Sequence, residues 1–145
     1  MIFLDAGPLI ALFYETDPFN EAAVEGFEKL ERSERPVFTT THCITEAIAV
    51  LSILPKSNFR LAAQAGLEIL EWPLEVVRAS IEEERRALRL MESYAGHEAS
   101  FVDCLSFILM DARGTRTAFT FDESHFVTLR KLKPWVPIPA RKPAP

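Results

Sequence analysis

The stretch Ile2-Phe3-Leu4-Asp5-Ala6-Gly7-Pro8-Leu9 holds one acid inside an otherwise apolar run near the N-terminus. Its beginning predicts a short apolar strand over residues 2–5, and Pro8 predicts the start of a short helix over residues 8–14. A carboxylate between two apolar segments is costly to bury unless it has a partner. We therefore interpret Asp5 as a functional residue at the end of the first strand.

The rest of the chain alternates strand and helix patterns. Further strands are predicted at 37–40, 74–77 and 117–121, with an edge strand at 135–138. Helices are predicted at 18–32, 41–54, 57–70, 80–94 and 100–112, the first three of them capped by Asp17, Thr41 and Ser57. This alternation predicts a parallel sheet covered by helices on both faces, with a site at the carboxyl ends of its strands.

The chain has 145 residues, 48% of them hydrophobic, which is typical of one soluble globular domain. We expect that domain over residues 1–138 and a loose, proline-rich basic tail over 139–145. Cys43 and Cys104 have no metal-binding spacing, which indicates free core thiols and a reducing compartment. No signal-peptide pattern and no membrane-length apolar run is present, so we expect a cytoplasmic protein with no membrane partner.

The net charge of −5 argues against a strongly basic nucleic-acid binder. Three acids nevertheless fall where the predicted topology places a site. Asp5 and Asp122 end strands, and Glu46 lies one turn into the helix after the second strand. Asp103, near a helix start, is a candidate to join them. Gathered carboxylates repel one another, and a divalent cation such as Mg²⁺ or Mn²⁺ offsets that repulsion.

Each of these acids also has a structural interpretation. Asp103 is also explained as a cap that pairs with Ser100, Glu46 as a solvated helix residue, and Asp122 as a turn residue after a strand. Spacing alone therefore supports a metal site but indicates no substrate.

The context of the acids resembles the PIN domain family, and within it the VapC-like toxins of toxin–antitoxin pairs. The resemblance rests on FLDAGPLIAL at residues 3–12, Thr45-Glu46, SFVD at 100–103 and the T-x-D pattern in AFTFD at 118–122. It implies a Rossmann-like α/β/α sandwich with a short, mostly parallel sheet. It also implies an endoribonuclease that cleaves single-stranded RNA with one or two Mg²⁺ or Mn²⁺ ions, forms a homodimer and binds a small antitoxin.

The resemblance carries catalytic and metal-ligand roles onto Asp5, Glu46, Asp103 and Asp122. Thr120 matches the threonine of the T-x-D pattern and is expected to position a ligand or water, although a β-branched strand residue is an equally good interpretation. Arg113, Arg116 and His125 are candidate RNA contacts, with solvated surface positions as the alternative.

Three other interpretations are weighed. Phe13, Phe19 and Phe27 recur at helical spacings, which favours core packing over a platform for base stacking. A non-catalytic PIN-like module that binds RNA or protein is the alternative function. A phosphohydrolase of the D-x-D type is disfavoured, because Asp5 is followed by Ala6-Gly7.

Overall fold

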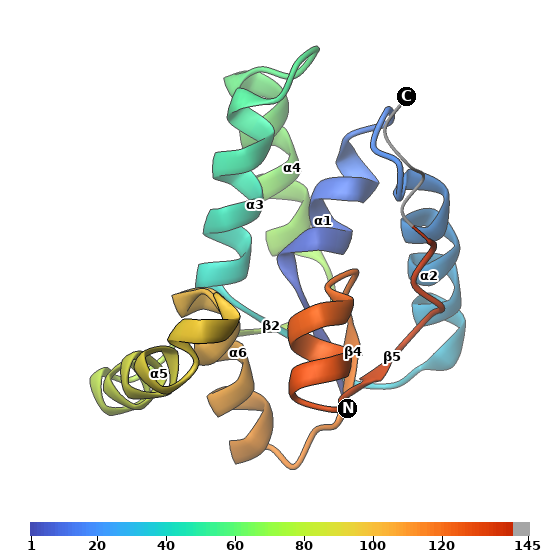
Figure 1. The fold of residues 1–145 in the computed structure, drawn as a ribbon. Helices are drawn as coiled ribbons and strands as arrows, with labels where there is room; N and C mark the ends of the chain where they lie inside the picture. The colour runs from blue at the N-terminus through green and yellow to red at the C-terminus, as the bar shows by residue number, and fades with distance from the viewer. Residues whose placement is uncertain (141–145) are drawn as a thin grey trace.

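Five parallel strands form the central sheet of the computed structural model, which describes residues 1–140 (Figure 1). Their order is β3-β2-β1-β4-β5. Because the chain builds outward from β1 in both directions, the neighbouring strands β1 and β4 form a topological switch point. The strands are β1 (Ile2–Leu4), β2 (Val37–Thr40), β3 (Glu75–Val77), β4 (Thr117–Phe119) and β5 (Lys133–Pro134).

Helices cover both faces of this sheet. The side chains of Ile2 and Leu4 pack into a core with α1 (Ala6–Phe13), α2 (Asn20–Ser33), α3 (Thr41–Ile53) and α4 (Phe59–Glu71). Phe3, which points to the other face, packs into a core with α5 (Ile81–Ser93), α6 (Phe101–Ala112) and the π-helix η2 (Glu123–Leu129). A short 3₁₀ turn, η1 (Ala95–His97), joins α5 to α6. The expected α/β/α sandwich is confirmed.

Three helix caps differ from the sequence prediction. Asp17 does not cap α2, because its Oδ1 accepts a hydrogen bond at 2.8 Å from the backbone N–H of Phe19, one residue before the helix. Thr40 rather than Thr41 caps α3, and Asn58 rather than Ser57 caps α4. In the last two cases the cap has extended backbone angles, and its side chain accepts a bond from the N–H three residues ahead.

The edge strand predicted at 135–138 is wrong, because β5 lies two residues earlier. The backbone N–H groups of Lys133 and Trp135 donate to β4 and its preceding loop, each at 2.8 Å. Pro134 between them has no N–H to donate, which is tolerated at a sheet edge. The indole N–H of Trp135 then donates to the carbonyl of Gly26 at 3.2 Å, and this bond fastens the chain to α2.

The π-helix η2 lies where the sequence pattern predicts no helix. It begins after Asp122, whose Oδ1 accepts a hydrogen bond at 2.9 Å from the backbone N–H of His125. No helix in the described part of the chain is long and apolar enough to span a membrane. Of the tail expected at 139–145, residues 141–145 lie outside the described residues.

Candidate active site

Asp5 and Thr120 join the ends of β1 and β4 at the switch point. Asp5 caps α1, with its Oδ1 accepting a hydrogen bond at 2.8 Å from the backbone N–H of Ala6. Its Oδ2 accepts a bond at 2.8 Å from the hydroxyl of Thr120, and that hydroxyl accepts one at 3.0 Å from the backbone N–H of Asp122. Thr120 therefore fixes the orientation of the Asp5 carboxylate.

Asp103 enters the site from the first turn of α6. It forms a capping box with Ser100: the Ser100 hydroxyl accepts from the Asp103 N–H at 3.0 Å, and Asp103 Oδ2 accepts from the Ser100 N–H at 3.1 Å. The same Oδ2 lies 3.6 Å from Nδ1 of His125. Asp103 is therefore both a cap and a member of the acidic cluster.

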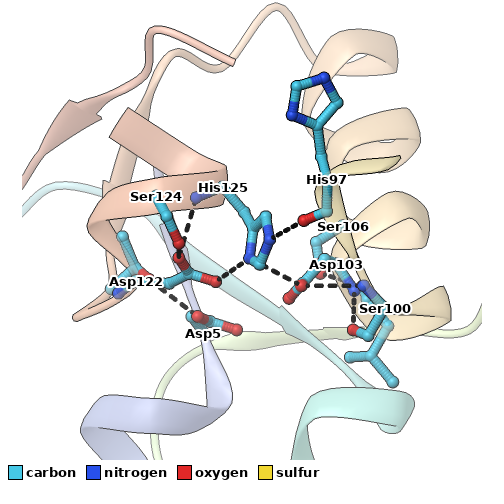
Figure 2. A network of polar contacts seen from close by, with 10 residues as sticks. Asp5, His97, Ser100, Asp103, Ser106, Asp122, Ser124 and His125 are labelled. Carbon is cyan, nitrogen blue, oxygen red and sulfur yellow. Dashed lines mark hydrogen bonds and ion pairs between the residues drawn. The ribbon is translucent and has the colours of Figure 1, made fainter. Parts of the chain in front are cut away.

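His125 lies between two carboxylates, as Figure 2 shows. Its Nδ1 is 2.9 Å from Oδ2 of Asp122, and its Nε2 is 2.7 Å from the carbonyl oxygen of His97. Since both ring nitrogens face acceptors, the doubly protonated imidazolium satisfies both contacts. Burial lowers the pKa of His125, but the hydrogen bonds to Asp122 and His97 and the charges of the nearby aspartates raise it above its ordinary value.

Glu46 approaches the cluster from the second turn of α3. The residue is largely exposed to solvent. Partial desolvation of its carboxylate, and then the charge of Asp103, raise its pKa. Glu46 also adds to the negative field at Asp5.

Three acids of the site, Asp5, Asp103 and Glu46, hold their protons more tightly than free carboxylic acids do. Burial, followed by the charge of Asp103, raises the pKa of Asp5 to about 7, although the bonds from Thr120 and Ala6 act in the opposite direction. Asp5 is only 7% exposed. Burial, opposed by the Ser100 bonds and supported by the charge of Asp122, also raises the pKa of Asp103. The site therefore concentrates negative charge that the protein alone does not neutralise.

This donor set fits a hard divalent cation. Asp103 and Asp122 each place a carboxylate oxygen within 4.8 Å of the other and of a ring nitrogen of His125. As an imidazolium, His125 is a neighbour of this group and not a ligand. The carboxylate of Asp5 lies beside these two carboxylates, close enough for Asp103 to raise its pKa. Carboxylate oxygens are the ligands that Mg²⁺ and Mn²⁺ prefer. A bound cation would stabilise the charged carboxylates against burial and then against mutual repulsion, the two causes that raise the pKa values of Asp5, Asp103 and Glu46.

Arg113 and Arg116 are not brought to this site. Asp103 lies in the first turn of α6 and Arg113 is its C-cap, about 15 Å away at 1.5 Å per residue. The guanidinium of Arg113 pairs with Glu75 at 3.1 Å, at the start of β3. Arg116 precedes β4, and its guanidinium faces backbone carbonyls at Arg130 and Lys131.

The bridging position of His125 is the main feature that sequence reasoning missed. A signal for it was present, because an aspartate followed three residues later by the N–H it caps, and then by Phe126 and Val127, is a helix-start pattern. The sequence pattern instead predicts that Asp122 is a metal ligand or a turn residue after a strand. A helix beginning at Glu123 would have placed His125 on its first turn, beside the acids.

Comparison with known proteins agrees with the geometry. Residues 2–132 match the family model of the PIN domain. No curated protein sequence matches the chain. Among solved structures, the chain is similar to Mycobacterium tuberculosis VapC20, described as a toxin that cleaves the sarcin–ricin loop. The two share 27% identity and a TM-score of 0.73, over 85% of this chain and 91% of that one.

The acids after β1 and β4, the order of the parallel strands and the family match over residues 2–132 agree with one another. The chain belongs to the PIN domain family and has a VapC-like fold.

Proposed function

We propose that this protein is a metal-dependent endoribonuclease and the toxin of a toxin–antitoxin pair. The observation that carries the proposal is the convergence of Asp5, Asp103 and Asp122 at the switch point, with Glu46 beside them. The likeness to a VapC toxin that cleaves RNA supports the same activity. Residues 1–138 would form the nuclease domain, in the cytoplasm where its substrate is found.

In this proposal Asp5, Asp103 and Asp122 hold Mg²⁺ or Mn²⁺, and Glu46 completes the set directly or through water. When bound, the cation lowers the pKa of a water molecule and stabilises negative charge on a phosphoryl group. Thr120 and the Ala6 amide hold both oxygens of Asp5 in place. His125, anchored on the His97 carbonyl, holds the carboxylate of Asp122.

The test is cleavage of RNA with Mg²⁺ or Mn²⁺, with and without EDTA. Sarcin–ricin loop RNA is the first substrate to use, because VapC20 is described as cleaving it. We expect EDTA and Asp5→Asn each to abolish cleavage, while Glu92→Gln on the exposed face of α5 leaves it intact. Cleavage that survives EDTA or Asp5→Asn would overturn the mechanism. Metal binding with inert RNA would favour a non-catalytic binding module.

A homodimer is the second part of the proposal, and an apolar stripe on α4 supports it. Phe59, Leu67 and Leu70 are 78%, 67% and 59% exposed and lie on one helix face. An antiparallel pairing of two α4 helices about a two-fold axis brings Phe59 toward the partner's Leu70.

An antitoxin partner is the third part, and it follows from the likeness to a VapC toxin. We expect expression of the chain alone to arrest growth. Co-expression of a short reading frame adjacent to its gene should restore growth. The protein that this reading frame encodes should co-purify with the chain. Growth arrest that persists in Asp5→Asn would show that toxicity does not come from the nuclease.

A further inference from the structure

The acidic site opens into a cleft of about 610 Å³ that is lined by both acidic and apolar side chains. Asp5 and Asp122 line this cleft, and so do the apolar side chains of Phe19, Phe121 and Ile138. The cleft therefore places aromatic side chains next to the acids that we propose hold the metal.

The two cleft phenylalanines are the outer end of an aromatic column that starts in the core. Phe27 packs against Phe119 at 4.9 Å between ring centroids, and Phe119 packs against Phe121 at 5.9 Å. Phe121 stacks on Phe19 at 4.9 Å, with 16° between the ring planes. Phe119 is fully buried, whereas Phe19 and Phe121 are only half-buried. The column thus ends in a stacked pair that is open to the cleft.

Phe19 is held in place before any ligand arrives. Its backbone N–H donates to Oδ1 of Asp17 at 2.8 Å, in the turn between α1 and α2. The side-chain amide of the next residue, Asn20, donates to the carbonyl of Ala11 at 2.8 Å and fastens this turn to α1. A ring fixed in this way loses little conformational freedom when a ligand stacks on it.

The charge of the cleft determines which part of an RNA strand the cleft can bind. Within residues 1–140, four carboxylates line the cleft (Asp5, Asp17, Asp122 and Glu123), and its one basic side chain, His125, already pairs with Asp122. The lining therefore carries an excess of negative charge, which disfavours direct ion pairing with phosphates. Nucleobases are uncharged, and every base offers a face that stacks on an aromatic ring.

We propose that Phe19 and Phe121 form a stacking subsite for a nucleobase adjacent to the scissile phosphate. The subsite rests on the proposed ribonuclease function and adds to it a physical basis for choosing the cleavage position. It binds one unpaired base and orients the strand, while the acids and their cation act on the phosphate.

The first test compares Phe19→Leu and Phe19→Tyr with the wild type on an RNA that the wild type cleaves. Loss of one stacking contact should raise KM by about 5- to 100-fold in Phe19→Leu. Phe19→Tyr keeps an aromatic face and should retain near wild-type KM. Phe13→Leu is the matched control, because Phe13 also stacks, on Trp72 at 6.0 Å, but does not line the cleft.

The second test replaces each nucleotide around the cleavage position by an abasic ribose. One such replacement should raise the KM of the wild type by as much as Phe19→Leu does. The same replacement should not raise the KM of the Phe19→Leu variant any further. If no position behaves in this way, or if Phe19→Leu and Phe13→Leu have equal effects, the subsite is refuted while the nuclease stands. If the wild type cleaves no RNA, the nuclease function itself fails.

A binding measurement separates stacking from turnover. We use Asp5→Asn with an oligonucleotide that carries 2-aminopurine at the position found by the abasic scan. Stacking should quench the fluorescence of this base, and adding Phe19→Leu should abolish the quenching. Quenching that is unchanged in the double variant would overturn the assignment to Phe19.

Discussion

Asp5 is the most deeply buried acid of the site, and its titration links stability to pH. Its pKa is about 7 in the folded protein, against 3.8 as the ordinary value. The folded state therefore binds the Asp5 carboxyl proton more tightly than the unfolded state does. The contribution of Asp5 to the free energy of unfolding is complete below about pH 4 and is lost as the pH rises through 7. The loss is at most about 4 kcal/mol.

Thermal unfolding of the metal-free protein in EDTA tests this linkage. We expect the melting temperature to fall between pH 5 and pH 8 in the wild type. Asp5→Asn cannot ionise, so its curve should be flatter and should lie above that of the wild type at pH 8. Parallel curves for the two proteins would show that Asp5 is not the group responsible.

Thr120 positions Asp5 through one hydroxyl, which donates to Asp5 and accepts from the Asp122 N–H. Thr120→Val keeps the shape but removes both bonds, so the pKa of Asp5 should rise further. We expect cleavage at pH 7 to fall about tenfold and the pH–rate profile to shift to higher pH. Thr120→Ser keeps the hydroxyl and should restore the cleavage rate and the pH–rate profile. An unshifted profile in Thr120→Val would contradict the positioning of Asp5 by Thr120.

The helices α5 and α6 both begin with a complete capping box. It is formed by Ser80 and Glu83 in α5, and by Ser100 and Asp103 in α6. Ser80→Ala and Ser100→Ala should each cost about 1 kcal/mol in the free energy of unfolding, measured in urea. Only Ser100→Ala should also weaken Mn²⁺ binding, measured by titration calorimetry, because Asp103 is a proposed ligand and Glu83 is not. Equal Mn²⁺ affinities in the two variants would contradict a ligand role for Asp103.

For the whole molecule, bound metal should add stability. A cation that relieves repulsion among the site acids binds the folded state preferentially. At about 100 times the Kd of Mn²⁺ we expect the melting temperature to rise by about 5 to 10 °C. The rise should be smaller in Asp5→Asn. An unchanged melting temperature at saturating Mn²⁺ would contradict the clustering of these acids.

The α4 stripe sets the expected oligomeric state. Leu67→Glu places a charge in the proposed interface, and we expect it to convert a dimer to a monomer in light scattering. Leu88→Glu on α5 is the matched control, because Leu88 is also exposed, at 52%, and lies outside the stripe. A dimer that survives Leu67→Glu would place the interface elsewhere.

Much of the fold could be predicted because the signals are local. The strand at 37–40 and the capping boxes at Ser80 and Ser100 follow from residues a few positions apart. The π-helix after Asp122 has a start signal in its cap but no periodic apolar pattern, and contacts with distant residues help to fix it. Phe126 stacks on Phe3 at 6.1 Å, across more than 120 residues of sequence.

The sequence by itself determined which acids this protein has and the order in which they follow strands and helices. Only the tertiary structure decided that Arg113 and Arg116 lie at the far end of the sheet, that His125 bridges Asp103 and Asp122, and that the pKa of Asp5 rises to about 7. The reason is physical. A carboxylate's burial and its distance from other charges depend on how segments more than 100 residues apart pack together, and no local pattern records that packing.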